Sequence, residues 1–157
     1  MRRVKKILLI IAVVFVALLG TCELHQLLSH DENIPRGYQS CKENFGETAW
    51  GGDKTDYCWY QYNADSMSLP SPYGEVCESN IPAIKGYFDD CRNWLKTEDR
   101  LDQYDFNSAC INEGDSMLLF TKEGQHIGSA NYGKYDHYTL YFFDKETAQL
   151  YYIHSSI

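Results

Sequence analysis

The sequence predicts an α+β fold in which one amphipathic helix packs on a C-terminal four-stranded antiparallel meander, braced by disulfides and preceded by an N-terminal signal or anchor helix. Three observations lead to this fold class. An apolar run follows four cationic residues at the N-terminus, residues 81–96 repeat apolar side chains at helical spacing, and residues 117–154 hold aromatic segments separated by turn residues.

The N-terminal element is the apolar run of residues 7–20, which directly follows Arg2, Arg3, Lys5 and Lys6. Fourteen helical residues rise about 21 Å, whereas the hydrocarbon core of a bilayer is about 30 Å thick. A cleaved signal peptide therefore fits this run better than a spanning helix, and a retained anchor is the alternative. Residues 19–22 also resemble a bacterial lipobox, in which Cys22 would be acylated. The sequence thus predicts a periplasmic protein or one tethered to the membrane and facing the periplasm.

The predicted organisation is a signal peptide or anchor at 1–22, a polar stalk at 23–36 and one extracytoplasmic domain at 37–157. Residues 23–157 hold ten basic and twenty-two acidic residues, a net charge of −12. Such a surface repels nucleic acid and favours a basic protein partner. The alternative is that the charge only keeps an exported protein soluble.

Five cysteines follow Cys22 without any CxxC pair and without histidines at metal-ligand spacing. In an oxidising compartment this pattern favours disulfides over a zinc site, and no cofactor is predicted. The pairing stays open, including whether Cys22 is a sixth partner. The disulfide candidates are Cys41, Cys58, Cys77, Cys91 and Cys110.

Residues 23–56 are polar and are expected to be irregular, with a turn at 50–53, before an aromatic strand at 57–62 and a proline-containing loop at 66–74. The helix is predicted from Pro82 at a first-turn position to Lys96. Its apolar stripe is Ile84, Phe88, Cys91 and Leu95, at steps of four, three and four residues.

Four strands are expected at 117–121, 125–130, 136–143 and 149–154. If residues 144–147 form a symmetric loop, opposed positions of the last hairpin sum to 291. One face then holds the core residues Tyr138, Leu140, Phe142, Tyr151 and Ile153. The other face is either a second packing layer or a recognition surface, with the candidate binding residues Tyr141, Tyr152, Phe143, His137 and His154.

In this register His137 and His154 face each other, which suits a metal bridge or a charge switch near pH 6. A metal site needs a third ligand, and no carboxylate has the right register, because Asp136 points to the opposite face. The sequence therefore predicts no metal site.

Two short motifs resemble those of papain-like peptidoglycan amidases and endopeptidases. Residues 114–120, Gly-Asp before an apolar strand, are followed by His126-Ile127-Gly128, and Cys58-Trp59-Tyr60 resembles the nucleophile segment of that family. The resemblance implies a thiol peptidoglycan hydrolase with Cys58 as nucleophile and His126 as base. Asn131 or Asp136 would then orient the imidazole ring.

Thirteen tyrosines and three tryptophans in an acidic exported domain favour a recognition surface over a catalytic pocket. The leading hypothesis is therefore a non-enzymatic binding module of the bacterial envelope, acting on a basic protein as a lysozyme inhibitor or an immunity protein does. The alternatives are the thiol hydrolase and a structural envelope protein without a specific partner. The sequence leaves the oligomeric state open.

Overall fold

The computed structural model describes residues 31–46, 54–64, 67–69, 72–129 and 136–156. The predictions for residues 1–30, among them Cys22, and for Asn131 lie outside these residues. The chain divides into two compact units, 1–34 and 35–157. In the first unit, the N–H of Ile34 donates to the carbonyl oxygen of Asp31 at 3.0 Å. Within the described part of the chain, no helix has the length and hydropathy of a membrane span.

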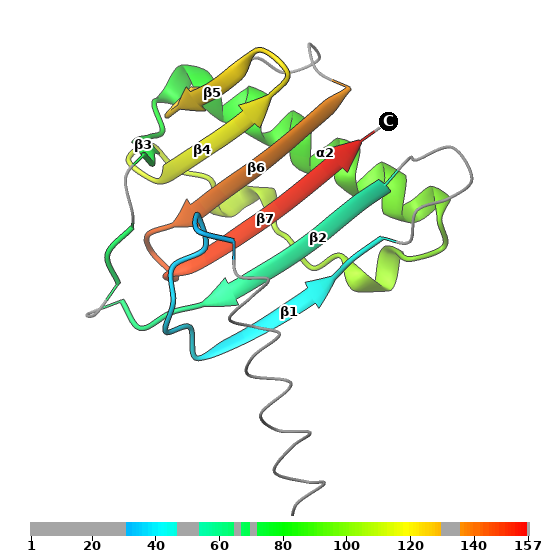
Figure 1. Ribbon diagram of the computed structural model, residues 1–157, viewed down its shortest axis with the longest axis horizontal. Coiled ribbons are helices and arrows are strands. Elements are labelled where there is room, and N and C mark those ends of the chain that lie inside the picture. Colours follow the sequence, from blue (N-terminus) through cyan, green and yellow to red (C-terminus); the bar gives the residue numbers. More distant parts are fainter. Residues whose placement is uncertain (1–30, 47–53, 65–66, 70–71, 130–135, 157) are drawn as a thin grey trace, which may run out of the picture. The chain divides into compact units, whose positions relative to one another are not determined.

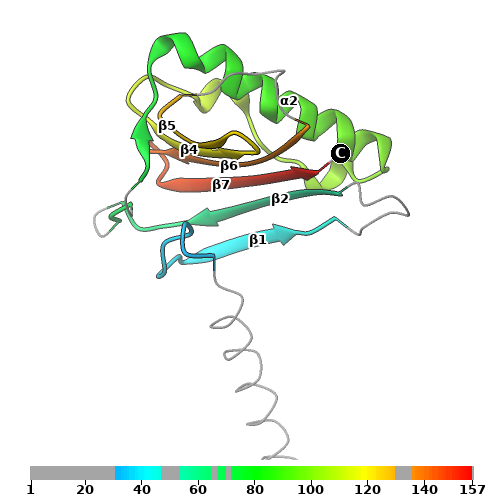
Figure 2. The same ribbon diagram turned by 45° about the horizontal axis from the view of Figure 1, so that its top comes forward.

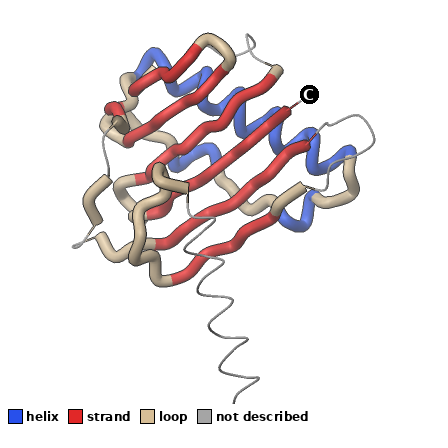
Figure 3. Tube along the Cα trace, viewed as in Figure 1, coloured by secondary structure: helices blue, strands red, loops and turns tan. Residues whose placement is uncertain are grey.

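The second unit is built on one antiparallel sheet of seven strands (Figure 1). The order is β1-β2-β7-β6-β4-β3, and β5 also pairs with β4, on the side away from β6. Figure 3 shows these strands in red. Their bounds are β1 Ser40–Asn44, β2 Lys54–Gln61, β3 Gly74–Glu75, β4 Ser116–Thr121, β5 Gly124–Ile127, β6 His137–Asp144 and β7 Gln149–Ser156.

The helix α2, Ile81–Thr97, covers one face of the sheet (Figure 2). Pro82 lies in its first turn, where the missing N–H costs no hydrogen bond. Asp99 follows the helix at φ +56°, and the N–H of Arg100 donates to the carbonyl of Leu95 at 2.8 Å. This is a Schellman-type C-terminus with aspartate at the position that glycine favours. The described residues also hold three short 3₁₀ turns: η1 Glu78–Asn80, η2 Leu101–Gln103 and η3 Ser108–Cys110.

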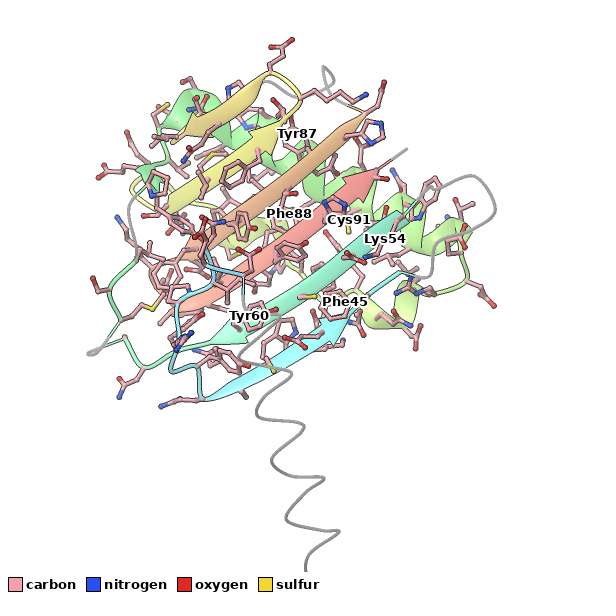
Figure 4. The ribbon with its side chains drawn as sticks, viewed as in Figure 1. Phe45, Lys54, Tyr60, Tyr87, Phe88 and Cys91 are labelled. Atoms are coloured by element: carbon pink, nitrogen blue, oxygen red, sulfur yellow. The ribbon has the colours of Figure 1, made fainter. Side chains whose placement is uncertain are left out.

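The core lies between α2 and the sheet. The predicted helical stripe is confirmed, and Tyr87 joins it as a fifth buried side chain; Figure 4 labels Tyr87, Phe88 and Cys91 on α2. Phe106 stacks on Phe88 with ring centroids 3.5 Å apart. The predicted core face of the last hairpin is also confirmed. The sheet contributes Tyr57, Met117, Leu119, Tyr138, Leu140, Phe142, Tyr151 and Ile153 to this core.

Asp105 ties the segment between α2 and β4 to the sheet. Its carboxylate accepts hydrogen bonds from the Tyr57 hydroxyl at 2.7 Å, the Trp59 indole at 3.1 Å and the Lys42 ammonium at 3.0 Å. Burial alone would raise the pKa of this carboxyl, but the three donors outweigh it and hold the pKa below its ordinary value.

The predicted four-stranded meander is wrong. β4 pairs with both β5 and β6, so β5 does not lie between them, and β1, β2 and β3 extend the sheet. Leu118 and Leu119 of β4 are both fully buried, as in a strand covered on both faces, whereas β5 is largely exposed and suits a border position. The polar sequence of β1, in the region expected to be irregular, lacks the alternation that marks a half-buried strand.

The disulfide bracing of the predicted fold is not found. No disulfide joins the five cysteines of the described residues. Cys58 and Cys91 are both buried but belong to opposite faces of the sheet, because Cys91 packs in the core with Tyr57, the neighbour of Cys58 on β2. The sheet therefore separates these two sulfurs.

The last hairpin has opposed positions that sum to 293 instead of 291, since Asp144 pairs with Gln149. Asp144 belongs to the strand because its carboxylate accepts the N–H groups of Glu146 and Thr147, at 2.9 and 3.3 Å, and so closes the turn. Ala148 completes the loop at φ +54°. A shift of two leaves every side chain on its predicted face.

Candidate recognition face

The sheet face opposite α2, here called the distal face, carries alternate residues of each strand. Cross-strand pairing arranges most of them in three rows that cross the sheet. The middle row is Ile127, Leu118, Tyr141, Tyr152, Cys58 and Glu43. The second row is Gln125, Phe120, Thr139, His154 and Asp56. The third row is Glu75, Ser116, Phe143, Leu150, Tyr60 and Cys41.

Aromatic rings form a contact network over this face. Tyr141 lies at its centre, with ring centroids 5.3 Å from Tyr152, 6.1 Å from Phe120 and 6.3 Å from Tyr73. Near β1, Tyr38 contacts Tyr60 at 5.2 Å. Tilted and edge-on rings at these distances stabilise one another beyond the burial of their area. The distal face is thus a second packing layer over much of its area.

The candidate binding residues differ in their accessibility. Tyr141 is only 3% exposed and Phe143 6%. Tyr152, His137 and His154 are half-buried and remain accessible in part. A partner docking on the distal face would therefore touch the last three directly, whereas Tyr141 would act by holding its neighbouring rings in place.

Sequence reasoning missed an accessible apolar side chain of this face, Ile127, which is 54% exposed. It also missed Phe120 and Tyr73, which are half-buried beside Tyr141. Because β5 was expected between β4 and β6, its side chains were not expected to form a border. We call Tyr73, Phe120, Ile127 and Tyr152 the apolar strip.

A polar group lies at one end of the distal face. Asp56 is 2% exposed, and its carboxylate accepts the N–H of Gly46 at 2.7 Å and contacts the Lys54 ammonium at 2.8 Å. His154 stands directly opposite Asp56, and its Nδ1 lies 2.9 Å from the Thr139 hydroxyl. Burial lowers the pKa of His154; Asp56 opposes this effect, and Lys54 and His137 add to it.

The prediction that His137 and His154 face each other is wrong, because the register of β6 and β7 differs from the expected one. His137 pairs with Ser156, and His154 pairs with Thr139, so the two rings are diagonal neighbours. Asp136 is exposed beside them. In the described ranges, no group of three or more His, Cys, Asp or Glu side chains is arranged to hold a metal ion.

The structure does not bring Cys58 and His126 together. Cys58 is on the distal face of β2, whereas His126 pairs with the core residue Leu119 and shares its face, bonded to Thr121 at 3.1 Å. Four strand spacings separate β2 from β5, which amounts to about 19 Å. Burial also raises the pKa of the Cys58 thiol to about 12. This pair therefore lacks the contact between thiol and imidazole that a thiol hydrolase needs.

Comparison of the chain with models of protein families, with curated proteins and with solved structures gives no match.

Proposed function

We propose that the chain is an exported, non-enzymatic binding module of the bacterial envelope, which engages a basic protein through the distal face. The observation that carries the proposal is the apolar strip, whose accessible side chains surround the buried ring of Tyr141. Ile127 at one end is more than half exposed, and the rings of Phe120, Tyr73 and Tyr152 are held in place by Tyr141. Rigid aromatic rings of this kind give contact area at a low entropic cost.

The charge of the chain supports a basic partner. Residues 23–157 carry a net charge of −12, and the exposed carboxylates Glu43 and Glu75 end two rows of the distal face on opposite sides. A partner with lysines and arginines around an apolar centre complements this pattern. Export is supported by the cationic and apolar N-terminal segment alone.

Binding of the full chain to lysozyme and to poly-L-lysine tests the proposal. Lysozyme with succinylated amines is the matched control, since it keeps its shape and loses its positive charge. We expect binding to native lysozyme or poly-L-lysine that weakens as ionic strength rises, and none to the succinylated protein. Absence of binding to both basic probes, or equal binding to native and succinylated lysozyme, contradicts a basic partner.

A second pair of variants tests the face. Phe120→Ala and Ile127→Ser each remove an accessible side chain of the apolar strip, and we expect each to weaken binding about tenfold. Leu101→Ser is the control, because Leu101 is an exposed apolar residue of η2, outside the distal face. Equal affinity in all three variants contradicts a role for the distal face.

A further inference from the structure

The strand β1 forms a border of the sheet. Within the described part of the chain it pairs with β2 alone, and Figure 1 shows it as the outermost strand beyond β2. Ser40, Cys41 and Glu43 are exposed along it. A border strand presents backbone N–H and C=O groups that can pair with a strand of another chain.

We propose that β1 pairs antiparallel with β1 of a second copy of this chain, with Cys41 on the two-fold axis. In a pairing with two-fold symmetry, the residue on the axis faces its own counterpart, and its neighbours face one another across the axis. The side chains of β1 therefore decide which residue can occupy the axis.

Charge excludes two registers, and the exposed thiol of Cys41 distinguishes the proposed register from those that remain. Lys42 on the axis would place two ammonium groups opposite each other, and Glu43 would place two carboxylates there, and like charges directly opposite are destabilising. With Cys41 on the axis, Ser40 faces the second copy's Lys42, and Gln39 faces its Glu43. No like charges then lie directly opposite each other. The ammonium of Lys42 also keeps its bond to Asp105 at 3.0 Å, on the other face from Cys41.

The same register allows a disulfide between the two copies. Directly opposed residues of antiparallel strands have Cα atoms about 4.5–5.5 Å apart, within the span of about 4.4–6.8 Å that a disulfide bridges. With oxidised glutathione as oxidant, one Cys41 thiolate attacks the glutathione disulfide and releases one glutathione. The second copy's Cys41 then displaces the other glutathione, so two protein thiols are oxidised and one glutathione disulfide is reduced to two thiols.

Five residues of strand form a small interface, so the non-covalent dimer is weak and the disulfide traps it. The experiment incubates the full chain in mild detergent with a glutathione redox buffer. Non-reducing mass measurement and peptide mapping then follow. We expect a dimer joined by Cys41 to Cys41. Cys41→Ser abolishes it, and Cys77→Ser, which removes another exposed thiol, leaves its yield unchanged.

The register is tested by two opposite charges at Ser40. Ser40→Lys places an ammonium opposite the second copy's Lys42 and lowers the dimer yield, whereas Ser40→Asp places a carboxylate there and raises it. Two such contacts per dimer change the dimer dissociation constant about fivefold in each direction. Because Ser40 is exposed, both variants are expected to fold, and circular dichroism checks this.

Moving the thiol by one residue completes the test. In the double variant Ser40→Cys with Cys41→Ser, position 40 faces position 42 of the second copy, so no interchain disulfide forms through it. A wild-type chain that stays monomeric, a dimer joined through any other cysteine, or equal yields for Ser40→Lys and Ser40→Asp would overturn the proposal.

Discussion

The Nδ1 atom of His154 lies 2.9 Å from the hydroxyl of Thr139, its partner across the β6–β7 ladder. Burial holds the pKa of this imidazole below its ordinary value of 6.5. The unfolded chain therefore binds a proton at a pH where the folded chain does not, so that the stability of the fold decreases as pH falls below about 6.5 and this contribution is constant above it.

The measurement is denaturant unfolding of the wild type and of His154→Gln at pH 7.5 and pH 5.5, chosen to lie about one unit either side of the unfolded pKa. The wild type is expected to lose more unfolding free energy between these values than His154→Gln does. Thr139→Val keeps the histidine but removes the hydroxyl. This variant therefore separates the effect of the hydrogen bond on stability from the effect of the imidazole charge. An identical pH dependence in wild type and His154→Gln would contradict the assignment.

Thiol labelling distinguishes the five described cysteines. In the folded chain, iodoacetamide is expected to label the exposed Cys41 and Cys77 and to spare the buried Cys58 and Cys91. Burial raises the pKa of Cys110 to about 12, with Asp144 and Asp115 adding to the effect, so its labelling is slow. Peptide mass spectrometry with and without denaturant gives the result. Labelling of Cys58 as fast as that of Cys77 in the folded chain would contradict the burial of Cys58 and would favour the thiol hydrolase.

The C-terminus of α2 offers a stabilising substitution. Asp99 is held at φ +56°, a conformation that costs a residue with a Cβ about 1 kcal/mol and costs glycine nothing. Asp99→Gly is therefore expected to raise the free energy of unfolding by about 1 kcal/mol. Asp102→Gly removes the same charge in η2, without a positive φ to relieve, and is expected to lower stability. Equal effects of the two variants on thermal unfolding would show that charge alone is responsible.

The stacked pair Phe88 and Phe106 anchors the segment that follows η2. Phe106 also meets Tyr151 edge-on, with centroids 4.7 Å apart, and is buried. Phe106→Ala is expected to lower the free energy of unfolding by about 3–5 kcal/mol. Phe45→Ala is the control, because Phe45 is 55% exposed and its contact with the Lys54 ammonium contributes less than about 1 kcal/mol. Similar losses in urea unfolding would contradict the core position of Phe106.

The sequence predicted the helix and both faces of the last hairpin because each depends on a local period. Ile84, Phe88, Cys91 and Leu95 recur at helical spacing, and the aromatic residues of β6 and β7 alternate at the strand period. A register error of two in that hairpin preserved the faces and still misplaced the contact of His137 with His154. After such an error each side chain stays on its predicted face of the sheet, but its cross-strand partner is a different residue.

The strand order could not be predicted from local sequence patterns. The sequence of Gly124–Ile127 does not indicate on which side of β4 this strand pairs. Its position depends on which elements cover Leu118 and Leu119 in the folded chain. β1 was missed because a border strand exposed on both faces needs no apolar alternation. The candidate site was affected in the same way: Tyr152 and His154 could be assigned to a face from the sequence, but the accessibility of Ile127 followed only from the border position of β5.

The position of β7 governs how the sheet can assemble. This strand comes last in sequence among the described strands, yet it lies between β2 and β6 and joins the β1–β2 hairpin to the remaining strands. Until Gln149–Ser156 has emerged and inserted, the two halves of the sheet share no backbone ladder and each shows an unpaired edge. Pairing of β2 with β7 spans most of the folded chain, and contacts of such sequence separation form slowly. A nascent chain at this stage exposes strand edges that can pair with another chain.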